Sequence, residues 1–205
     1  MKKNNKIIFI VIGVIAVVVV VFLIFSKGSN KEEVYEVGKD IEAGEYVLVG
    51  KGTYTLGNVS EKDYGYYEIC STEDCDVSTG GMVDNDNVFG KAYVIVENGQ
   101  YLKTKSMKLY KVDEYKASVA NSISYDYNFG FSSYYKVGKD FSAGTYNISG
   151  DNFYYFVCSK PGCETVGVFD TEILSSGDSN SSSTLTVENG QYLVVSGTEP
   201  FTITR

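Results

Sequence analysis

The chain of 205 residues carries 18 Lys and Arg against 26 Asp and Glu, a formal net charge of −8, and it contains no histidine. Without histidine, hydrolases of the Ser-His-Asp and Cys-His types are excluded, as are zinc sites that use histidine. The acidic balance also argues against a basic groove, so we expect no nucleic-acid partner.

An uncharged apolar segment, Ile7–Phe25, stands near the start of the chain and is preceded by three lysines. Its 19 residues would span about 28 Å as a helix, close to the hydrocarbon thickness of a bilayer. The lysines place residues 1–6 in the cytoplasm and the rest of the chain outside. A cleaved signal peptide is the alternative, but its apolar region would be long and no small-residue cleavage site follows. We therefore predict an uncleaved transmembrane helix at residues 7–25, followed by a polar spacer at residues 26–33.

Two phrases occur twice in the remaining chain. Residues 35–46 read Tyr-Glu-Val-Gly-Lys-Asp-Ile-Glu-Ala-Gly-Glu-Tyr, and residues 135–146 read Tyr-Lys-Val-Gly-Lys-Asp-Phe-Ser-Ala-Gly-Thr-Tyr, with eight of twelve positions identical. Residues 96–102 and 187–193 both read Val-Glu-Asn-Gly-Gln-Tyr-Leu. This duplication in the same order predicts two tandem domains.

We place the first domain at residues 34–111, a linker at residues 112–133 and the second domain at residues 134–205. Both domains consist of short apolar segments separated by turn residues, and neither contains a convincing amphipathic helix. The predicted fold is therefore all-β, with two small sandwich or jelly-roll-like domains after the transmembrane helix. The strands expected include residues 64–69, 107–112, 154–157, 165–169 and 201–204.

The first phrase is predicted to form a turn at Gly38-Lys39-Asp40, with the Asp40 carboxylate bonded to nearby backbone. A functional pairing of Lys39 with Asp40 is the alternative, but adjacent charges on a turn are usually solvated. Ile41 and Phe141 follow the turn in the two copies, and we expect both side chains to enter the core.

The second phrase contains Asn98-Gly99, which is typical of a type I′ hairpin turn. Such a hairpin would place Val96 directly opposite Tyr101. The second copy would pair in the same way.

The two copies differ most before their cysteine pairs, where the first has 12 extra residues. We predict a loop there, around residues 51–63, because insertions are tolerated in loops. Asp84-Asn85-Asp86-Asn87 is another polar stretch, with oxygen ligands at alternating positions as in calcium loops. The other EF-hand ligands are missing, so a turn-forming loop is predicted instead of a metal site.

The four cysteines form two pairs, Cys70 with Cys75 and Cys158 with Cys163. Opposite positions of an antiparallel hairpin lie within disulfide range, and each pair encloses a short loop. Outside the cytoplasm, structural disulfides are favoured over a zinc site or over a redox pair with Cys-x-x-Cys spacing. We therefore predict that each pair forms a disulfide that staples a hairpin.

Tyrosines gather at Tyr64, Tyr66 and Tyr67, and again in the linker at Tyr125 and Tyr127. Exposed tyrosines stack on sugar rings and form hot spots for proteins, whereas strand tyrosines often fill a core. We predict these five as candidate ligand contacts, although the linker aromatics could instead dock onto a domain. No pair of carboxylates stands out for glycoside hydrolysis, and we predict no enzymatic activity, cofactor or metal.

The phrase Val-Gly-Lys-Asp-Ile-Glu-Ala-Gly-Glu-Tyr, followed by Glu-Asn-Gly-Gln-Tyr-Leu, resembles a recurrent extracytoplasmic β-domain of Gram-positive bacteria. That domain has a Val-Gly-x-Asp-Ile-Pro-Ala-Gly-x-Tyr phrase and a later Gly-Gln-Tyr-Leu phrase, often behind a lipid or helix anchor. Here Glu42 and Ser142 replace the usual proline, and the cysteine pairs are an addition. The resemblance covers both repeats; it implies location and fold and transfers no functional residue.

We therefore expect a single-pass protein of the cell membrane, with a cytoplasmic N-terminus and two β-domains outside. Its predicted role is binding or interaction in the cell envelope, with wall glycan or another envelope protein as the partner. A sensory or accessory subunit of a membrane complex is the alternative function, and a small envelope hydrolase is a weaker one.

Overall fold

The computed structural model describes residues 31–162, 173–178 and 184–205. The predicted transmembrane helix at residues 7–25 lies outside the described residues, as does the strand expected at residues 165–169. Among the described residues, no helix is long and apolar enough to cross a membrane. Glu32–Arg205 forms one compact unit.

The described part of the chain is all-β, as predicted, with one short 3₁₀ turn at Val77–Thr79. The strands of the first repeat are β1 (Glu32–Glu36), β2 (Gly44–Gly50), β3 (Gly52–Leu56), β4 (Val59–Cys70), β5 (Met82–Phe89), β6 (Lys91–Val96), β7 (Tyr101–Lys105) and β8 (Met107–Lys111). Those that follow are β9 (Ile123–Tyr125), β10 (Ser133–Lys136), β11 (Gly144–Gly150), β12 (Phe153–Cys158), β13 (Ile173–Asp178), β14 (Thr184–Val187), β15 (Tyr192–Gly197) and β16 (Phe201–Thr204). The expected strands at 64–69, 107–112, 154–157 and 201–204 are confirmed as parts of β4, β8, β12 and β16.

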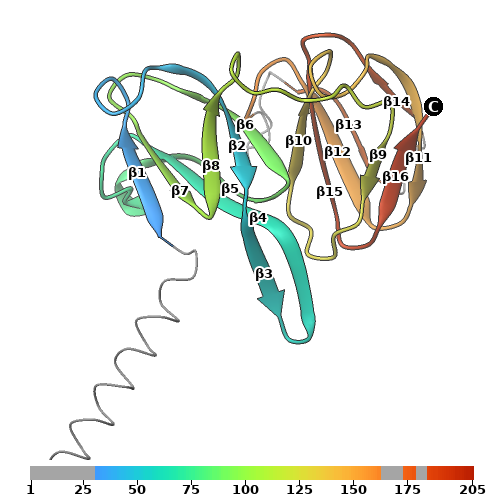
Figure 1. Cartoon of the computed structure of the whole chain (residues 1–205), viewed down its shortest axis with the longest axis horizontal. Helices are drawn as coiled ribbons and strands as arrows, with labels where there is room; N and C mark the ends of the chain where they lie inside the picture. The colour runs from blue at the N-terminus through green and yellow to red at the C-terminus, as the bar shows by residue number, and fades with distance from the viewer. Residues whose placement is uncertain (1–30, 163–172, 179–183) are drawn as a thin grey trace, which may run out of the picture. The chain divides into compact units, whose positions relative to one another are not determined.

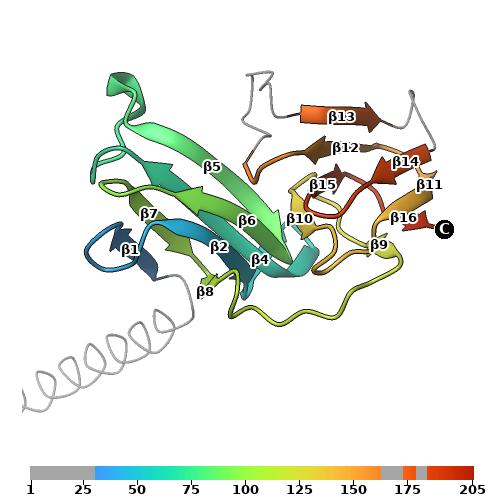
Figure 2. The ribbon, with the colours of Figure 1, turned by 90° about the horizontal axis from the view of Figure 1, so that it is seen from above.

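Each repeat builds two antiparallel sheets (Figure 1). In the first repeat, one sheet has the order β1-β7-β4-β3 with β5 beside β4, and the other has the order β6-β2-β8. In the second repeat, the orders are β10-β15-β12-β13 and β14-β11-β16, and β9 of the linker pairs with β16 at the edge of the latter sheet. The two repeats lie side by side, and β10 of the second repeat contacts β6 of the first (Figure 2).

A buried apolar cluster lies within each repeat. The alternation of side chains along a strand explains which residues enter it: Leu185 and Val187 are buried, whereas Thr184 and Thr186 between them are exposed. The cluster of the first repeat also contains Tyr134, Tyr192 and Val194, which belong to the second repeat. The repeats therefore share buried surface.

Within each repeat, the segments that carry the two repeated phrases are hydrogen-bonded to each other. This contact explains why both phrases recur together. In the first repeat, the Val37 amide donates to Gln100 O at 2.8 Å, and the Gly99 amide donates to Val37 O at 2.9 Å. The second repeat reproduces both bonds around Val137 at 2.9 and 3.0 Å. Gly38, at φ 96°, leaves room for this approach, because a Cβ there would lie only 3.0 Å from the Asn98 side chain.

The predicted hairpin at Asn98-Gly99 is wrong. Val96 pairs with Gly44 in one sheet, whereas Tyr101 pairs with Glu36 in another, so the turn carries the chain between two sheets. An Asn-Gly turn is a local signal that does not say which sheet the outgoing strand joins. Here the backbone of Val37 takes the hydrogen bonds that a hairpin partner would have made. The second copy turns the same way, with β14 paired to β11 and β15 paired to β10 and β12.

The predicted turn after β1 is confirmed. The Asp40 carboxylate accepts the Glu36 amide at 2.9 Å, and Asp140 accepts the Lys136 amide at 2.7 Å. Phe141 is fully buried in the second core, as expected. Its counterpart Ile41 is only partly buried, although it packs against the first core.

Three segments expected to be loops or linker carry strands. Residues 51–63 form β3 and the start of β4, and the stretch at 84–87 lies on β5, where tyrosine hydroxyls satisfy its polar side chains. Residues 112–133 contribute β9, which pairs with β16. β3 pairs with the adjacent start of β4 as a local hairpin. The partners of β9 and of the side chains at 84–87 come from other parts of the chain, which short-range composition does not reveal.

The first predicted disulfide is present. Cys70 and Cys75 are bonded with their Cα atoms 5.2 Å apart, within the connection from β4 to β5. Cys158 is also a disulfide cysteine. Its predicted partner Cys163 lies outside the described residues.

Candidate functional site

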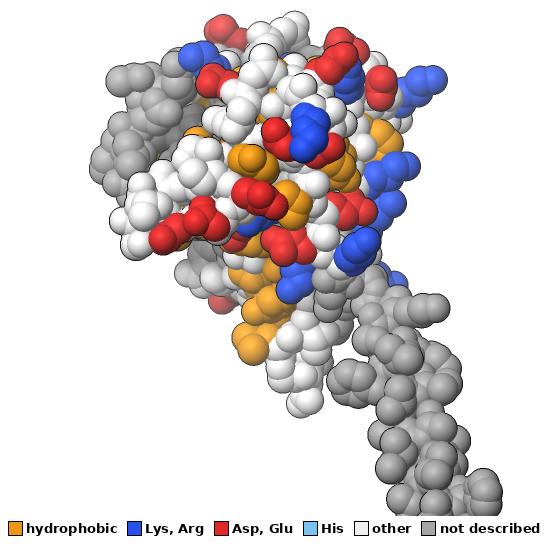
Figure 3. Space-filling view, turned by 90° about the vertical axis from the view of Figure 1, so that its left-hand side faces the viewer, with side chains coloured by type: hydrophobic (Ala, Val, Ile, Leu, Met, Phe, Trp, Pro, Cys, Tyr) orange, Lys and Arg blue, Asp and Glu red, His pale blue; other side chains and the backbone are white. Residues whose placement is uncertain are grey.

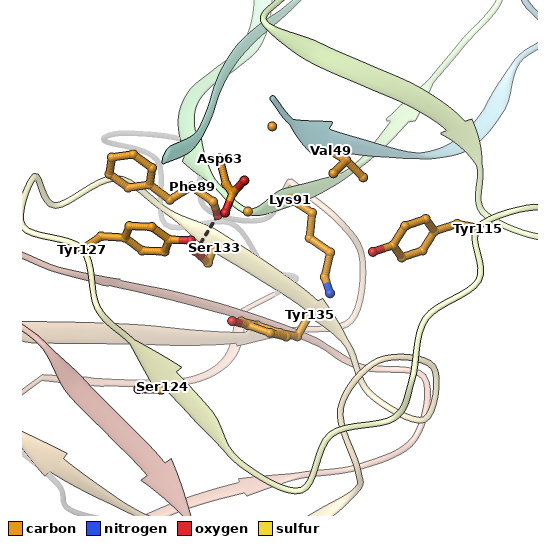
Figure 4. Close-up of a pocket in the computed structure, with 11 residues that line it drawn as sticks. Val49, Asp63, Phe89, Lys91, Tyr115, Ser124, Tyr127, Ser133 and Tyr135 are labelled. Atoms are coloured by element: carbon orange, nitrogen blue, oxygen red, sulfur yellow. Dashed lines mark hydrogen bonds between the residues drawn. The ribbon is translucent and has the colours of Figure 1, made fainter. Parts of the chain in front are cut away.

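A cavity of about 290 Å³ opens where the two repeats and the linker meet (Figure 4). Its lining combines aromatic rings, two serines, one lysine, one aspartate and a stretch of close-packed backbone. These residues are Val49, Gly50, Asp63, Phe89, Gly90, Lys91, Tyr115, Ser124, Tyr127, Ser133 and Tyr135. The first repeat, the linker and the second repeat all contribute, so the cavity exists only when the whole unit is assembled.

One wall is backbone, and a β-bulge shapes it. The register between β3 and β4 shifts after Gly52, and Asp63 adopts a left-handed φ of 61° at that point. The Gly90 amide donates to Asp63 O at 2.9 Å, and the Gly50 amide donates to Gly90 O at 2.8 Å. This bulge turns the Asp63 side chain out of the strand pairing and places it at the cavity (Figure 4).

A second wall comes from the linker, whose aromatic residues dock at the junction. The Tyr127 ring stacks on Phe89 with the ring centroids 4.3 Å apart. Phe131 also packs on Phe89, at 5.3 Å, and on Tyr54, at 4.9 Å. Docking of the linker aromatics, one of the two expectations for them, is therefore what the structure shows.

The charged groups at the cavity are paired across the two repeats. Lys91 Nζ lies 2.6 Å from Asp140 Oδ2, and the same oxygen accepts the Tyr93 hydroxyl at 2.9 Å. Lys91 also lies over the Tyr135 ring, 4.9 Å from its centroid, and Figure 4 shows its side chain reaching between Tyr115 and Tyr135. Burial and the neighbouring Asp140 carboxylate raise the pKa of Tyr93, so this tyrosine is protonated at physiological pH.

Three tyrosine hydroxyls at the cavity have no protein partner among the described residues: those of Tyr115, Tyr127 and Tyr135. Burial raises the pKa of all three, and no hydrogen bond offsets it. By contrast, the hydroxyls of Tyr46 and Tyr192, outside the cavity, bond to the Glu42 carbonyl and the Glu45 carboxylate. The cavity therefore concentrates hydrogen-bonding groups that the fold does not use.

Asp63 adds a free acceptor to these hydroxyls. Its carboxylate makes no ion pair or hydrogen bond with any described residue, and it is solvent-exposed at the rim. Ser133, in contrast, donates to Phe89 O at 2.6 Å, and Ser124 bonds to Asp126. The arrangement can hold a ligand with several hydroxyl or amide groups and an apolar face. Its volume is at the lower end for ligand pockets, so it suits a small ligand or the end of a chain.

The five predicted ligand tyrosines are spread over different environments. Tyr127 lines the cavity, whereas Tyr64 does not, and the Tyr64 hydroxyl donates to Asn87 at 2.8 Å. Tyr66 bonds to Glu68 at 2.7 Å on β4. Tyr67 and Tyr125 are fully buried, so the described surface does not present their rings.

The five predicted ligand contacts do not include Asp63, Lys91, Tyr115 or Tyr135, although Tyr135 stands in the second tyrosine-rich stretch. Asp63 did carry a signal, because it ends the segment in which the first repeat is longer than the second. Tyr135 is the first residue of a repeated phrase, and nothing in the sequence distinguishes it from Tyr35 at the same position of the first copy. Nothing local marks Lys91 or Tyr115, since both become part of a site only through tertiary contacts.

A metal site does not arise from the one close group of ligand-type atoms among the described residues, Glu68, Cys70 and Cys75. Its two sulfurs are bonded to each other, whereas a metal needs free thiolates.

Comparison with known proteins identifies no relative of this chain. No known protein family matches the chain, and no curated protein is significantly similar to it.

Proposed function

We propose that this protein is a membrane-anchored binding protein of the cell envelope, and that the cavity between its repeats holds the ligand. The observation that carries the proposal is the convergence of three unpartnered tyrosine hydroxyls and the free carboxylate of Asp63 on one cavity. The three tyrosines are half-buried and Asp63 is exposed, so these polar groups are accessible to a ligand in a cavity that also offers aromatic rings, a combination typical of binding sites.

The ligand class that fits best is a glycan of the cell wall. Sugars offer many hydroxyls for tyrosine and carboxylate partners and apolar ring faces for aromatic side chains. Lys91 is already paired with Asp140, so the cavity offers no free cation that would select a strongly anionic ligand. Asp63 is the one carboxylate that lines the cavity, which favours binding over glycoside hydrolysis, because hydrolysis uses two.

The proposed location follows from the sequence. Residues 7–25 would anchor the chain with its N-terminus in the cytoplasm, and each repeat would form a small β-sandwich domain outside. The two sheets of each repeat and the two buried clusters, each centred on one repeat, support this domain division. The repeated phrases support membership in the Gram-positive extracytoplasmic β-domain group that they resemble.

Binding can be tested with the full-length protein and purified peptidoglycan, followed by calorimetry with soluble wall-glycan fragments. We expect the combined Tyr115→Phe, Tyr127→Phe and Tyr135→Phe variant to bind about 100-fold more weakly, since each hydrogen bond contributes about 1 kcal/mol. Asp63→Asn should weaken binding about tenfold while keeping the left-handed backbone, which asparagine tolerates.

Tyr101→Phe is the matched control, because it removes the same atom from a tyrosine outside the cavity. Its affinity should equal that of the unmodified protein. Equal binding by the triple variant would reject the cavity as the site, and protein that stays in the supernatant would reject the glycan.

A sensory or accessory subunit of a membrane complex is the second candidate function. The ion pairs that link the repeats, Lys91 with Asp140 and Lys136 with Glu45, favour it, because a ligand between them could alter their contact. Crosslinking in intact cells separates the two functions: a protein partner supports the subunit, and wall polymer supports the glycan-binding protein.

A further inference from the structure

β3 and the first half of β4 form a hairpin at residues 52–64, the hairpin arm. It projects from the body of the first repeat (Figure 1). The second repeat has no such extension, because the arm lies in the segment where the first repeat is longer. By the rise of a strand, the five residues of β3 give the arm a length of roughly 16 Å.

The arm ends in exposed apolar side chains. Leu56 and Val59 pair directly across the turn, and they are 61% and 44% exposed. Figure 3 shows hydrophobic side chains along the projection at the bottom of the view. A tip of this kind is unusual on a strand end in water, where charged or polar residues are preferred.

The base of the arm is held in place by the linker. The Tyr54 ring lies 4.9 Å from the rings of both Phe129 and Phe131, and Asn128 donates to the Glu61 carboxylate at 2.7 Å. The arm therefore has a defined direction relative to the rest of the unit.

Three exposed lysines surround the same base: Lys51, Lys105 and Lys108. The Lys51 amide donates to Ser106 O at 2.8 Å, which places it beside the other two. None of the three forms an ion pair with a described residue. Figure 3 shows basic side chains at the root of the projection.

The chain enters the unit at this same place. Glu32, the first residue of β1, pairs in register with Lys105. In Figure 1, the start of β1 and the turn of the arm lie on the same side, whereas the connection from β8 to β9 runs along the opposite side. Residues 26–31 separate Glu32 from the predicted membrane helix, and six residues span at most roughly 20 Å. An arm of similar length then reaches the bilayer surface.

We propose that the hairpin arm docks on an anionic lipid bilayer, with Leu56 and Val59 in the interface and the three lysines against the headgroups. The proposal rests on the membrane anchor of the proposed function. Two apolar side chains and a few lysines bind a membrane weakly by themselves. Tethering through the anchor keeps the arm at a high local concentration, so a weak contact is sufficient. The contact would set the orientation of the cavity above the membrane.

The absence of tryptophan from the chain gives a direct test. The full-length Leu56→Trp variant, reconstituted into vesicles of phosphatidylcholine and phosphatidylglycerol, carries its only tryptophan at the tip. We expect blue-shifted emission and quenching by lipids brominated on the acyl chain. The Val119→Trp control, at an exposed position on the connection from β8 to β9, should stay red-shifted and unquenched.

Charge reversal tests the role of the lysines. Lys51→Glu, Lys105→Glu and Lys108→Glu together should abolish quenching of Leu56→Trp on anionic vesicles, since each lysine contributes about fivefold to surface partition. Quenching that does not change with lysine charge would overturn the headgroup contact.

The remaining outcomes separate this proposal from the one on which it rests. Protein that fails to float with the vesicles would overturn both the anchor and the arm contact. Floating protein with an unquenched Leu56→Trp would overturn the arm contact and leave the anchor intact. A disulfide-linked dimer of Leu56→Cys without Trp quenching would assign the tip to a second copy of the chain instead.

Discussion

At the scale of single residues, the aspartate at one position of the repeated phrase makes different contacts in the two repeats. Asp40 and Asp140 occupy the same position of the repeated phrase, and each accepts a backbone amide of its own turn. The second carboxylate oxygen of Asp140 also binds Lys91 and Tyr93 of the first repeat, and its side chain is only 1% exposed. A turn residue in one copy has thus become a contact between repeats in the other.

Replacing these aspartates should therefore have unequal effects. Asp140→Ala leaves Lys91 and Tyr93 without their partner in a buried place, and we expect a loss of about 3–5 kcal/mol in the free energy of unfolding. Asp40→Ala removes one exposed hydrogen bond, which costs about 1 kcal/mol. Urea denaturation of both variants measures the difference, and equal losses would contradict a special role for Asp140.

At the scale of elements, the close meeting of β2 with the bulge on β4 shapes the cavity. Gly50 ends β2 against Asp63, and a Cβ at Gly50 would lie 2.0 Å from the Asp63 carbonyl oxygen. Real Cβ atoms do not approach backbone so closely, so only glycine fits unless the strands separate. Gly57, at the turn of the hairpin arm, also has a positive φ but faces open space.

We expect Gly50→Ala to lower the free energy of unfolding by about 3 kcal/mol or more, because the two backbones must move apart. Ligand binding should fall as well, since Asp63 moves with the bulge. Gly57→Ala is the control and should cost only about 1–2 kcal/mol, the penalty of a left-handed alanine. Thermal and urea unfolding check both values; a Gly50→Ala variant as stable as Gly57→Ala would show that the approach is less tight than described.

At the scale of the whole molecule, polar contacts join the repeats in addition to the apolar cluster that they share. Lys136 bridges to Glu45 at 2.7 Å, and the same carboxylate accepts the Tyr192 hydroxyl at 2.8 Å. The Tyr134 hydroxyl donates to the half-buried Asp86 at 2.7 Å, and Asp84, two residues earlier on β5, is half-buried as well. Burial raises the pKa of Asp84 to about 6 and also raises the pKa of Asp86.

These carboxylates predict how stability depends on pH. The folded pKa of Asp84, about 6, exceeds its ordinary value of 3.8, so the folded state binds more protons between these pH values. The free energy of unfolding should therefore fall as the pH rises from about 4 to about 6, by up to about 3 kcal/mol from this group.

Asp84→Asn mimics the protonated form and can still accept the Tyr67 hydroxyl, which donates to Asp84 at 3.1 Å. We expect it to raise the free energy of unfolding at pH 7 by about 1–3 kcal/mol and to flatten the pH dependence. Glu97→Gln, at an exposed site outside this cluster, should leave the profile unchanged. A less stable Asp84→Asn protein at pH 7 would contradict the raised pKa.

Much of the architecture could be predicted from short-range patterns. The alternation of apolar residues identified the strands at 64–69 and 201–204, and the repeated phrases identified the turn at Asp40. Spacing alone indicated the Cys70–Cys75 disulfide. The turn at Asn98-Gly99 was recognised as a turn but assigned the wrong strand pairing, because pairing is decided by contacts with Val37, about 60 residues earlier in the chain.

The sequence by itself determined that the chain after the apolar segment is a duplicated, disulfide-containing β-protein without histidine chemistry. Composition, alternation and repetition are local properties, and each can be read without knowing which segments meet. Only the tertiary structure decided that Asp63, Lys91, Tyr115, Tyr127 and Tyr135 share one cavity. These residues come from a bulge, a strand start, a linker and a repeated phrase, and they converge because the two repeats pack on each other. A cavity between domains is a long-range property, so no single segment of the chain contains its signal.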